Sequence, residues 1–404
     1  MKINKDSIRN KIRLLIDGII YAESFFHRRK APEFINGRQK KRILIMRKDG
    51  LGDCIVFYPT LKAYRDFYKD DEVTLVFPTY LESLATVFNK DLIDHVIWFN
   101  HKLFGSSFFY RRNFMLNLKR AGYDVVIYPV YSREGIGFFM MNMTGAHERI
   151  GFDGDISEHG KRSEQRGTLR YTRLIKVPEG MKSELARDTY FAEQVTGKKI
   201  SFSFPTIDVN TLPSAGADMV IQKYGLAQKK YAVIFPGAGI PYRIWPHDRF
   251  AAVIDHIVAL GIAVVIAGGP KEKGLAQNII SLTTEKTRIS RAIVNLTGET
   301  DLPTLSRILA RAQFYFGSDT GVLHLAAAVG TPCIGIMGMG GLDRFFPYGD
   351  LSKNKVIFDK TKKWITGSWT DGHFMKPGEI HPSIKNITLE DAKKEIDAMI
   401  KYKS

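Results

Sequence analysis

The sequence predicts an α/β protein of two domains, each built on a parallel β-sheet, with the two sheets facing a central cleft. Three observations support this fold class. Short apolar runs alternate with stretches of helical periodicity, which indicates parallel strands covered by helices on both faces. The alternation stops at the Pro- and Gly-containing segment 204–216 and then begins again. A length of 404 residues also fits two domains of ordinary size.

The first domain begins with the apolar run 42–46, which we interpret as a buried strand. The turn Arg-Lys-Asp-Gly-Leu-Gly-Asp follows at 47–53 and opens a helix that ends near Lys69. Further strands are expected, with helices between them, at 73–77, 96–99 and 124–128. Residues 153–173 are polar and basic without a clear period, so we expect a long loop there.

The second domain repeats this organisation. A strand at 231–235 runs into the turn Pro-Gly-Ala-Gly, and a helix is expected at 250–260. A strand at 263–267 runs into Gly-Gly-Pro, and another helix begins at Pro303. Because ligands of such sheets bind beyond the carboxyl ends of the strands, two facing domains would place a binding site between them.

Residues 314–338 predict a strand, a tight turn, a short helix and a second strand. Ser318 and Asp319 are residue types that cap helices, and Thr320 and His324 lie four positions apart, so they share a helix face. A glycine turn that opens a helix offers free N–H groups and the positive end of the helix dipole to an anion. The segment therefore indicates a ligand that carries phosphate.

The N-terminal extension is basic. Residues 1–42 hold 12 Lys and Arg against 4 Asp and Glu, about half of the net charge of +17. A helical stripe of apolar residues runs through it, made of Ile8, Ile12, Leu15, Ile16, Ile19 and Ile20. Two interpretations stay open: adsorption to an anionic membrane surface through residues 1–30, or docking of the helix on the protein's own body.

Composition argues against several classes of protein. The sequence has no run of 18 or more uncharged apolar residues, so we expect no transmembrane helix, and its N-terminus does not resemble a signal peptide. Cys54 and Cys333 stand far apart among apolar residues, which favours buried thiols over a disulfide or a metal pair. RNA-binding motifs, zinc-finger spacings and metal-ligand clusters are missing, so we expect no nucleic-acid partner and no metal.

The turn at 47–53 is a partial match to a dinucleotide fingerprint, but Ile55 stands where the third glycine belongs. It places Asp53 at a helix start, where the carboxylate could accept a proton from an incoming hydroxyl or simply cap the helix. In the second domain, Arg243 lies in a loop after a strand. Its guanidinium suits a diphosphate, although a solvated loop arginine is an equal alternative.

Two residues of the segment 314–338 also have competing interpretations. His324 is either a buried structural histidine or a neighbour of the ligand. Asp319 would repel a phosphate, so we expect it to cap the helix or to bond a sugar hydroxyl or the backbone.

Five sets of motifs, in their order along the chain, resemble those of the heptosyltransferase family, glycosyltransferase family 9. They are Arg-Lys-Asp-Gly-Leu-Gly-Asp at 47–53, Phe-Pro-Gly-Ala with Arg-Ile-Trp-Pro at 235–246, Ala-Gly-Gly-Pro at 267–270, Asn-Leu-Thr-Gly at 295–298, and Gly-Ser-Asp-Thr-Gly-Val-Leu-His-Leu-Ala-Ala-Ala-Val-Gly-Thr-Pro at 317–332. The resemblance covers about residues 42–350.

The resemblance implies a GT-B fold of two Rossmann-like domains around a cleft. Members transfer a sugar, often heptose from ADP-heptose, to a lipopolysaccharide-core acceptor, with inversion and without a required metal or other cofactor. It therefore implies a nucleotide-sugar donor, an acidic glycolipid acceptor and a cytoplasmic enzyme peripheral to the inner face of the membrane. A nucleotide-sugar epimerase of similar fold and a non-catalytic nucleotide-sugar-binding protein are the alternatives.

Site residues follow from the family motifs by position. Asp53 is expected to be the general base. The expected donor-binding residues are Gly237, Ala238, Gly239, Arg243, Asp319, Thr320, Gly321 and His324. On the acceptor side we expect Arg47, Gly52, Ser132, Arg133 and Arg162, and for Arg133 and Arg162 the expectation comes from their charge and not from a family motif. Lys161 and Arg166 would add to the positive charge that suits a phosphorylated lipid core.

The resemblance also assigns the segments of the chain. Residues 42–210 would bind the acceptor and residues 211–384 the donor. A basic extension, 1–41, precedes them and is additional to the family pattern. The last segment, 385–404, is expected to form a helix that packs back on the N-terminal domain.

Overall fold

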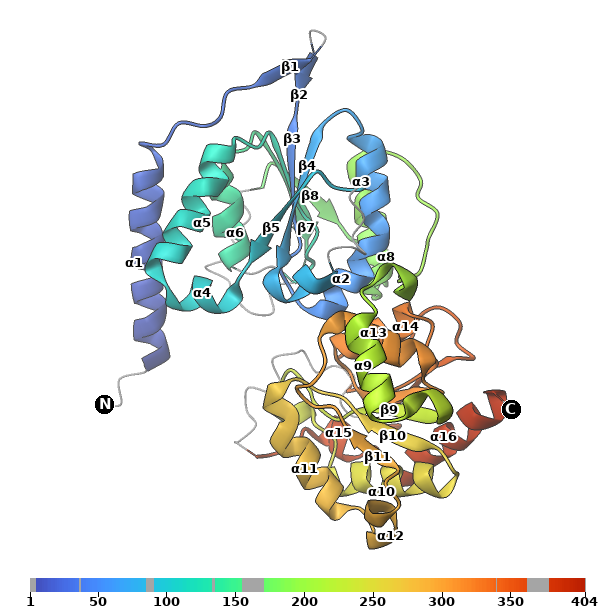
Figure 1. Cartoon of the computed structure of the whole chain (residues 1–404). Coiled ribbons are helices and arrows are strands. Elements are labelled where there is room, and N and C mark those ends of the chain that lie inside the picture. Colours follow the sequence, from blue (N-terminus) through green and yellow to red (C-terminus); the bar gives the residue numbers. More distant parts are fainter. Residues whose placement is uncertain are drawn as a thin grey trace.

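The structure, a computed structural model, describes residues 5–35, 38–84, 91–132, 135–154, 171–338, 340–361 and 378–403. Its main architecture is two six-stranded parallel sheets, one in each half of the chain (Figure 1). When the strands of each sheet are counted in chain order, both sheets have the spatial order 3-2-1-4-5-6. This is the doubly wound arrangement of Rossmann-like domains, and it confirms the predicted α/β class with parallel sheets.

The N-terminal sheet has the strand order β5-β4-β3-β6-β7-β8. Its strands are β3 (Arg42–Met46), β4 (Glu72–Pro78), β5 (His95–Phe99), β6 (Val125–Tyr128), β7 (Glu148–Asp153) and β8 (Arg173–Lys176). All five residues of β3 are buried, as expected of a central strand covered on both faces. A separate two-stranded hairpin, β1 (Glu33–Ile35) and β2 (Arg38–Lys40), precedes the sheet.

Helices cover both faces of this sheet (Figure 1). They are α2 (Leu51–Phe57), α3 (Leu61–Phe67), α4 (His101–Ser106), α5 (Phe108–Ala121), α6 (Gly135–Thr144) and α8 (Glu184–Thr196), with the 3₁₀ turns η1 (Tyr58–Thr60) and η2 (Thr79–Leu84). The single helix predicted to end near Lys69 is divided into α2, η1 and α3. Pro59 lies in η1 and has no N–H to donate, which explains the interruption.

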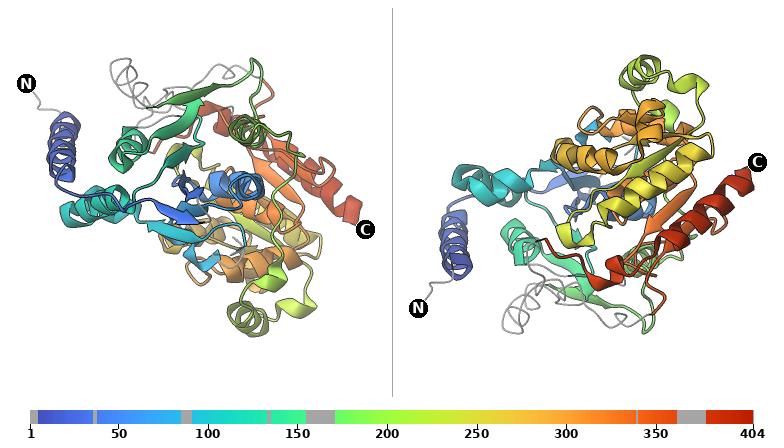
Figure 2. Two further views of the ribbon diagram at one scale, coloured as in Figure 1. Left: turned by 90° about the horizontal axis from the view of Figure 1, so that it is seen from above. Right: turned by 90° about the horizontal axis from the view of Figure 1, so that it is seen from below.

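The first helix, α1 (Lys5–Ser24), lies alongside α5 on the outside of the N-terminal domain (Figures 1 and 2). Ile20 is fully buried there, and Ile16 packs against the same hydrophobic cluster. The structure therefore supports docking on the protein's own body for the inner face of this helix. Several apolar residues of the outer face remain exposed.

The C-terminal sheet has the strand order β11-β10-β9-β12-β13-β14. Its strands are β9 (Tyr231–Phe235), β10 (Ala263–Ile266), β11 (Ile293–Asn295), β12 (Tyr315–Ser318), β13 (Cys333–Ile336) and β14 (Asn354–Ile357). Its helices are α9 (Ala215–Lys223), α10 (His247–Ala259), α11 (Lys273–Leu282), α12 (Glu285–Ile289), α13 (Leu302–Arg311), α14 (Gly321–Ala328), α15 (Pro382–Lys385) and α16 (Leu389–Lys403). The 3₁₀ turns are η3 (Val209–Thr211), η4 (Leu226–Gln228), η5 (Pro241–Arg243) and η6 (Pro270–Glu272).

The position of α16 corrects one expectation from the sequence, which was packing on the N-terminal domain. Ala392, Ile396 and Met399 are buried in the same hydrophobic cluster as α10, on one face of the C-terminal sheet. The Nε2 atom of His256 on α10 lies 2.7 Å from Oδ1 of Asp397. The apolar stripe of α16 thus finds its partner within its own domain.

One hydrophobic cluster continues from the N-terminal sheet into the C-terminal sheet. It contains residues of β3, α2 and α8 together with residues of β9, α13 and α14. Helices α2 and α14 contact one another where the two domains meet. The carboxyl ends of the two sheets are therefore joined by packed side chains.

Candidate active site

Asp53 lies in the first turn of α2, directly after the turn that follows β3. Its Oδ2 accepts a hydrogen bond of 3.1 Å from the backbone N–H of Gly50, which is the N-cap residue. Asp53 therefore helps to cap the helix from its third position and is not the N-cap residue that the simpler interpretation expected. The side chain is still 30% exposed. Asp53 can therefore both cap the helix and take up a proton, because Oδ2 accepts the hydrogen bond from the Gly50 N–H while part of the carboxylate is still exposed to solvent.

The electrostatic surroundings of Asp53 raise its pKa to about 7. Burial contributes most, and the carboxylates of Asp49 and Glu184 add to the increase. The Arg47 guanidinium and the Gly50 N–H act in the opposite direction. A carboxylate with a pKa near neutrality binds a proton more readily than an ordinary one, which is what a general base requires.

Arg47 is buried beneath this turn and was expected on the acceptor side. Its Nη1 lies 3.2 Å from Oδ1 of the buried Asp188 on α8 and also donates to the carbonyl of Pro129. Its Nε lies 3.2 Å from Oδ1 of Asp49, and its Nη2 lies 4.0 Å from Oδ1 of Asp53. With its side chain only 1% exposed, Arg47 stabilises a group of carboxylates from inside and is not placed to contact an acceptor directly.

Gly52 and Gly321 allow the two domains to approach closely. A Cβ atom added at Gly321 would lie 2.5 Å from Cβ of Leu51 and 2.9 Å from the backbone N of Gly52. A Cβ atom added at Gly52 would lie 2.6 Å from Cδ2 of His324. Gly52, expected on the acceptor side, thus has a packing role, since a side chain at either glycine would push α2 and α14 apart.

His324 is buried at this contact, on α14. Its Nδ1 lies 3.2 Å from the hydroxyl of Tyr348, and the two rings stack with their centroids 5.7 Å apart. Burial lowers the pKa of the imidazole to about 4, so it is neutral at pH 7. A neutral, packed imidazole can offer a hydrogen bond to a ligand but supplies no positive charge.

The N-terminus of α14 lies next to a pair of opposite charges. Thr320 is the N-cap residue, which corrects the expectation that Ser318 or Asp319 would cap this helix. Its side chain makes no capping hydrogen bond, so this helix start keeps the donors that a bound anion requires. Burial raises the pKa of Asp319 to about 6, and the positive charge of Arg243 opposes that increase.

Arg243 lies in η5, the turn between β9 and α10. Burial lowers its pKa, and the Asp319 carboxylate opposes this effect, so the two groups interact electrostatically across the carboxyl end of the sheet. A guanidinium remains protonated in proteins, and its forked donors match phosphate oxygens. The structure thus brings together two of the expected donor-binding side chains, Arg243 and Asp319.

Three glycines at the carboxyl ends of β9 and β10 surround a residue that sequence reasoning missed. Cβ atoms added at Gly237, Gly268 and Gly269 would each lie 2.9 to 3.0 Å from a side-chain atom of Glu272. Glu272 is half-buried at the end of η6. In doubly wound domains an acidic residue at this edge of the sheet can accept hydrogen bonds from a ribose.

The remaining donor-side glycine and alanine lie in the same turn. Ala238 is half-buried and Gly239 is exposed, and no heavy atom would come within 4 Å of a Cβ added at Gly239 among the described residues. With respect to the described residues, a side chain would thus fit at position 239, whereas at Gly237 it would collide with Glu272.

Of the remaining residues expected on the acceptor side, the structure describes Ser132 but not Arg133 or Arg162. The Ser132 hydroxyl accepts a hydrogen bond of 2.8 Å from Nη2 of Arg344, in the C-terminal domain, so Ser132 takes part in a contact between domains. Nε of the same arginine lies 2.7 Å from Oε1 of Glu184, at the start of α8. Arg133 and Arg162 lie outside the described residues, as do Lys161 and Arg166.

Arg344 could not have been found from the sequence. It contacts Glu184 across 160 positions of sequence, and no local pattern marks either residue as a partner of the other. Over the described part of the chain, no group of three or more His, Cys, Asp or Glu side chains is positioned to hold a metal ion.

Solved structures identify the class of protein that has this fold. The E. coli ADP-heptose lipopolysaccharide heptosyltransferase II matches with a TM-score of 0.65 and 16% identity, over 90% of this chain and all of that one. A glycosyltransferase family 9 protein from Veillonella parvula matches with a TM-score of 0.66 and 19% identity, over 89% of this chain and 97% of that one. The two Rossmann-like domains thus form the GT-B fold of glycosyltransferases.

The sequence defines the family more closely. The profile of glycosyltransferase family 9 (heptosyltransferase) matches residues 111–364, well over half of the chain. The chain therefore belongs to glycosyltransferase family 9 and is a glycosyltransferase.

Characterised relatives match over shorter stretches. Lipopolysaccharide heptosyltransferase 3 of Escherichia coli is 33% identical over 131 residues, which are 32% of this chain and 36% of the relative. Lipooligosaccharide heptosyltransferase 2 of Haemophilus influenzae is 28% identical over 167 residues, 41% of this chain and 46% of the relative. The matched region thus spans less than half the length of these relatives.

Proposed function

We propose that this enzyme transfers heptose from ADP-heptose to an acidic cell-envelope glycolipid of the lipopolysaccharide-core type, with inversion at the anomeric carbon. One observation carries the proposal: the helices α2 and α14 meet at Gly52 and Gly321, so a carboxylate of one domain and the helix N-terminus of the other lie at the same junction. The start of α2 provides the Asp53 carboxylate, whose pKa is about 7. The start of α14 provides backbone donors beside Arg243.

The proposed reaction is a single displacement. The acceptor hydroxyl attacks the anomeric carbon from the face opposite the diphosphate, while Asp53 takes the hydroxyl proton. A carbon–oxygen bond to the acceptor forms, and the bond from the anomeric carbon to the phosphate oxygen breaks. The electron pair of that bond leaves with the nucleoside diphosphate, so negative charge increases on the phosphate.

We assign the stabilisation of that charge to Arg243 and the N–H groups at the start of α14. Charged donors that are already in position stabilise a leaving diphosphate without reorganising during the reaction. This proposal needs no metal ion in any step. His324 would contribute a neutral hydrogen bond, in keeping with its pKa of about 4.

The donor nucleoside would occupy the turns after β9 and β10. No described atom would come within 4 Å of a Cβ added at Gly239, and Glu272 presents a carboxylate that can accept hydrogen bonds from ribose hydroxyls. Support for an ADP-linked heptose comes from related structures: E. coli heptosyltransferase WaaC, at 18% identity, has been solved with ADP and with ADP-2-deoxy-2-fluoro heptose.

We place the acceptor side on the N-terminal domain, at the cytoplasmic face of the membrane. The chain has a net charge of +17, which favours a phosphorylated acceptor over a neutral one. Arg133 and Arg162 stay predictions for this contact. No helix in the described segments is both long and apolar enough to cross a bilayer.

The test is a thermal-shift panel of ADP-, UDP- and GDP-linked sugars, followed by product analysis with each stabilising donor. We expect ADP-heptose to raise the melting temperature and ADP to be released only when a lipid-core acceptor is present. Preference for a UDP- or GDP-sugar would contradict the donor assignment. Conversion of the donor sugar without any acceptor would show an epimerase, and binding without turnover would show a non-catalytic protein.

A further inference from the structure

Among the side chains of α1 that the structure describes, the acidic ones point toward the protein, and most of the apolar ones, with the exception of Ile16 and Ile20, are exposed. Asp17 accepts hydrogen bonds of 2.7 Å from both Nε and Nη2 of Arg111 on α5. Glu23 accepts one of 2.6 Å from Nε of Arg112, the next residue of α5. The two acidic residues whose side chains are described in this helix are thus neutralised against the body.

Over residues 12–26, where the side chains are described, the opposite side carries no charged residue. We define the α1 face as the exposed apolar side chains of the helix and of the two residues just after it: Ile12, Leu14, Leu15, Ile19, Tyr21, Phe25 and Phe26. Between them on the same side lie Gly18 and Ala22, also exposed. A surface helix of a soluble domain normally shows the reverse pattern, with polar residues outward.

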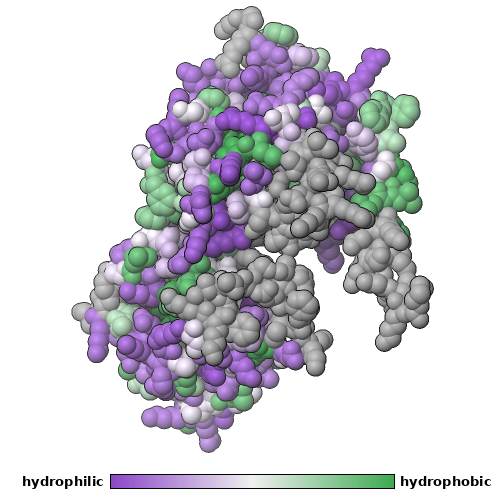
Figure 3. Space-filling view, turned by 180° about the vertical axis from the view of Figure 1, so that it is seen from behind, coloured by the Kyte–Doolittle hydropathy of each residue, from purple (hydrophilic) through white to green (hydrophobic). Residues whose placement is uncertain are grey.

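The α1 face forms a continuous surface. Strongly hydrophobic side chains gather along the edge of the molecule where α1 lies (Figure 3). Leu14 is 71% exposed, Leu15 is 66% exposed and Phe26 is 87% exposed. Exposed apolar patches of this kind mark sites of contact with a partner or a membrane.

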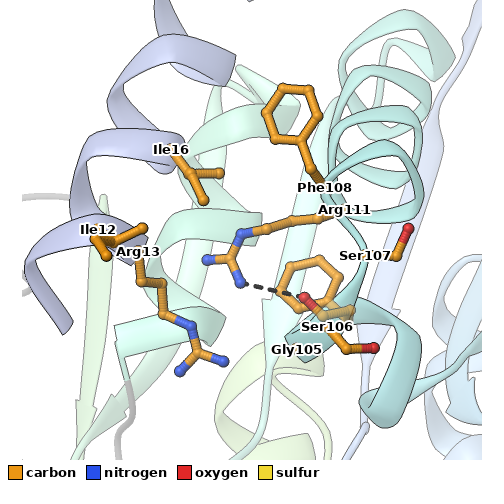
Figure 4. Close-up of a pocket in the computed structure, with 9 residues that line it drawn as sticks. Ile12, Arg13, Ile16, Gly105, Ser106, Ser107, Phe108 and Arg111 are labelled. Atoms are coloured by element: carbon orange, nitrogen blue, oxygen red, sulfur yellow. Dashed lines mark hydrogen bonds between the residues drawn. The ribbon is translucent and has the colours of Figure 1, made fainter. Parts of the chain in front are cut away.

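A groove with a volume of about 400 Å³ runs between α1 and the α4–α5 segment. Ile12, Ile16 and Phe108 form apolar walls, and the guanidinium groups of Arg13 and Arg111 point into the space between the helices (Figure 4). Arg111 is already bonded to Asp17, whereas Arg13 lies at the exposed rim. Apolar walls with a cation at the rim match an amphiphile that has an anionic head and a hydrocarbon tail.

The charge around the α1 face favours an anionic bilayer over a second copy of the chain. Arg28 and Lys30, two and four residues after Phe26, are exposed, and residues 1–42 carry an excess of basic over acidic residues. Two copies joined through this face would bring like charges together, which is unfavourable. An anionic leaflet would attract the same charges.

We propose that the α1 face docks the protein on an anionic phospholipid bilayer, with α1 lying in the headgroup region and the groove receiving a phospholipid. This arrangement is that of an interfacial amphipathic helix, whose binding combines apolar burial with attraction to anionic lipid. The proposal concerns binding of the protein to lipid and does not depend on the donor or the acceptor.

The test is flotation of the full chain with vesicles of phosphatidylcholine, alone or mixed with phosphatidylglycerol. We expect binding to the mixed vesicles, little binding to phosphatidylcholine alone, and weaker binding as salt increases. Absence of binding to mixed vesicles would overturn the proposal.

A double variant, Leu14→Glu with Leu15→Glu, tests the α1 face itself. Loss of two leucines from the interface is expected to weaken vesicle binding by about tenfold or more. The matched control is Met219→Glu with Ile289→Glu, because these residues are 67% and 73% exposed on the C-terminal domain. Equal vesicle binding by both double variants, with unchanged thermal unfolding, would contradict docking through this face.

A second set of experiments distinguishes binding to lipid from self-association of the protein. Replacing Arg13 and Arg28 by glutamine is expected to weaken binding to mixed vesicles by about fivefold for each charge removed. Sedimentation velocity is expected to show the same mass for the wild-type protein and the Leu14→Glu, Leu15→Glu variant. A wild-type dimer that this variant converts to a monomer, without any vesicle binding, would show that the face is a subunit interface and would overturn the proposal.

Discussion

The two domains have the same strand order, yet the helices that meet at their junction begin in different surroundings. In the N-terminal domain, α2 carries Asp53 in its first turn, and Asp49 lies in the turn before the helix. In the C-terminal domain, α14 begins at Thr320, which makes no side-chain capping bond, beside Arg243. The first helix start is occupied by its own carboxylate, and the second is available to a negatively charged ligand.

This difference shows what the fold determines and what the side chains determine. A doubly wound sheet places helix N-termini at the carboxyl ends of its strands, and those N-termini favour anions. At α2 the anion is the carboxylate of Asp53, and burial, together with the nearby carboxylates of Asp49 and Glu184, raises its pKa. At α14 the anion would be the donor diphosphate. In the proposed mechanism, one architecture would thus provide a proton acceptor on one side and a leaving-group site on the other.

Replacing the carboxylate at the start of α2 is expected to have the largest effect. Asp53→Asn keeps an oxygen for the Gly50 N–H but cannot take a proton, so kcat should fall by about 10² to 10⁴. Donor affinity, measured by calorimetry, should be unchanged. Asp66→Asn is the matched control, because Asp66 pairs with Lys62 on the surface of α3. Turnover retained by the Asp53 variant would remove Asp53 as the base.

Removing the positive charge of Arg243, beside the start of α14, should weaken the binding of the donor. Arg243→Ala is expected to weaken ADP and donor affinity about 10- to 100-fold, since hydrogen bonds to charged groups contribute about 1.5–3 kcal/mol. Arg243→Lys should restore part of the affinity, because lysine keeps the charge but not the forked donors. Calorimetric titration with ADP gives the comparison. If Arg243→Ala binds ADP as tightly as the wild type, the diphosphate lies elsewhere.

The close approach of the two helices can be tested at Gly321. Gly321→Ala would place a methyl group against Leu51 and the backbone of Gly52, so we expect a loss of about 1–3 kcal/mol in the free energy of unfolding. Gly274→Ala is the control, because Gly274 lies in α11 with no described atom within 4 Å of an added Cβ. Unfolding in denaturant measures the free energy of unfolding of both variants. Equal stability of the two variants would show that the contact between α2 and α14 is loose.

The smallest expected effect is a shift in the pH dependence of kcat/KM when Asp49 is replaced. Because Asp53 must be deprotonated to act as a base and its pKa is about 7, kcat/KM should rise with pH to half its maximum at about pH 7. Asp49→Asn removes a negative charge that raises this pKa, so the half-maximum should move to lower pH. A pH–rate profile of both proteins measures the shift. Movement to higher pH, or none, would contradict the electrostatic assignment.

Much of this fold could be predicted, because buried strands and glycine turns are local patterns. The central strands were expected at 42–46, 231–235 and 263–267, and they are found as β3, β9 and β10 with at most one residue of difference. The edge strands β8, β11 and β14 were missed. They are three or four residues long and only partly buried, so their apolar runs are too short to stand out.

The candidate site was predictable where a motif encodes it and not where partners come from distant parts of the chain. Asp53 and Gly321 lie at the domain junction, as their motifs indicated. The burial of Arg47 depends on Asp188, which is 141 positions away. Its place in the sequence, beside a buried strand, was equally compatible with exposure. Pairings of this kind appear only once the chain is folded.

The hydrophobic cluster that joins both sheets makes the stability of each domain depend on the other. Residues of α2 and α14 belong to that one cluster, so unfolding either domain alone would expose apolar surface of its neighbour. We therefore expect the two sheets to melt in a single calorimetric transition. A nucleotide that binds only the C-terminal domain would then protect backbone amides of β3 from hydrogen exchange as well, because local opening of either half would require opening of both.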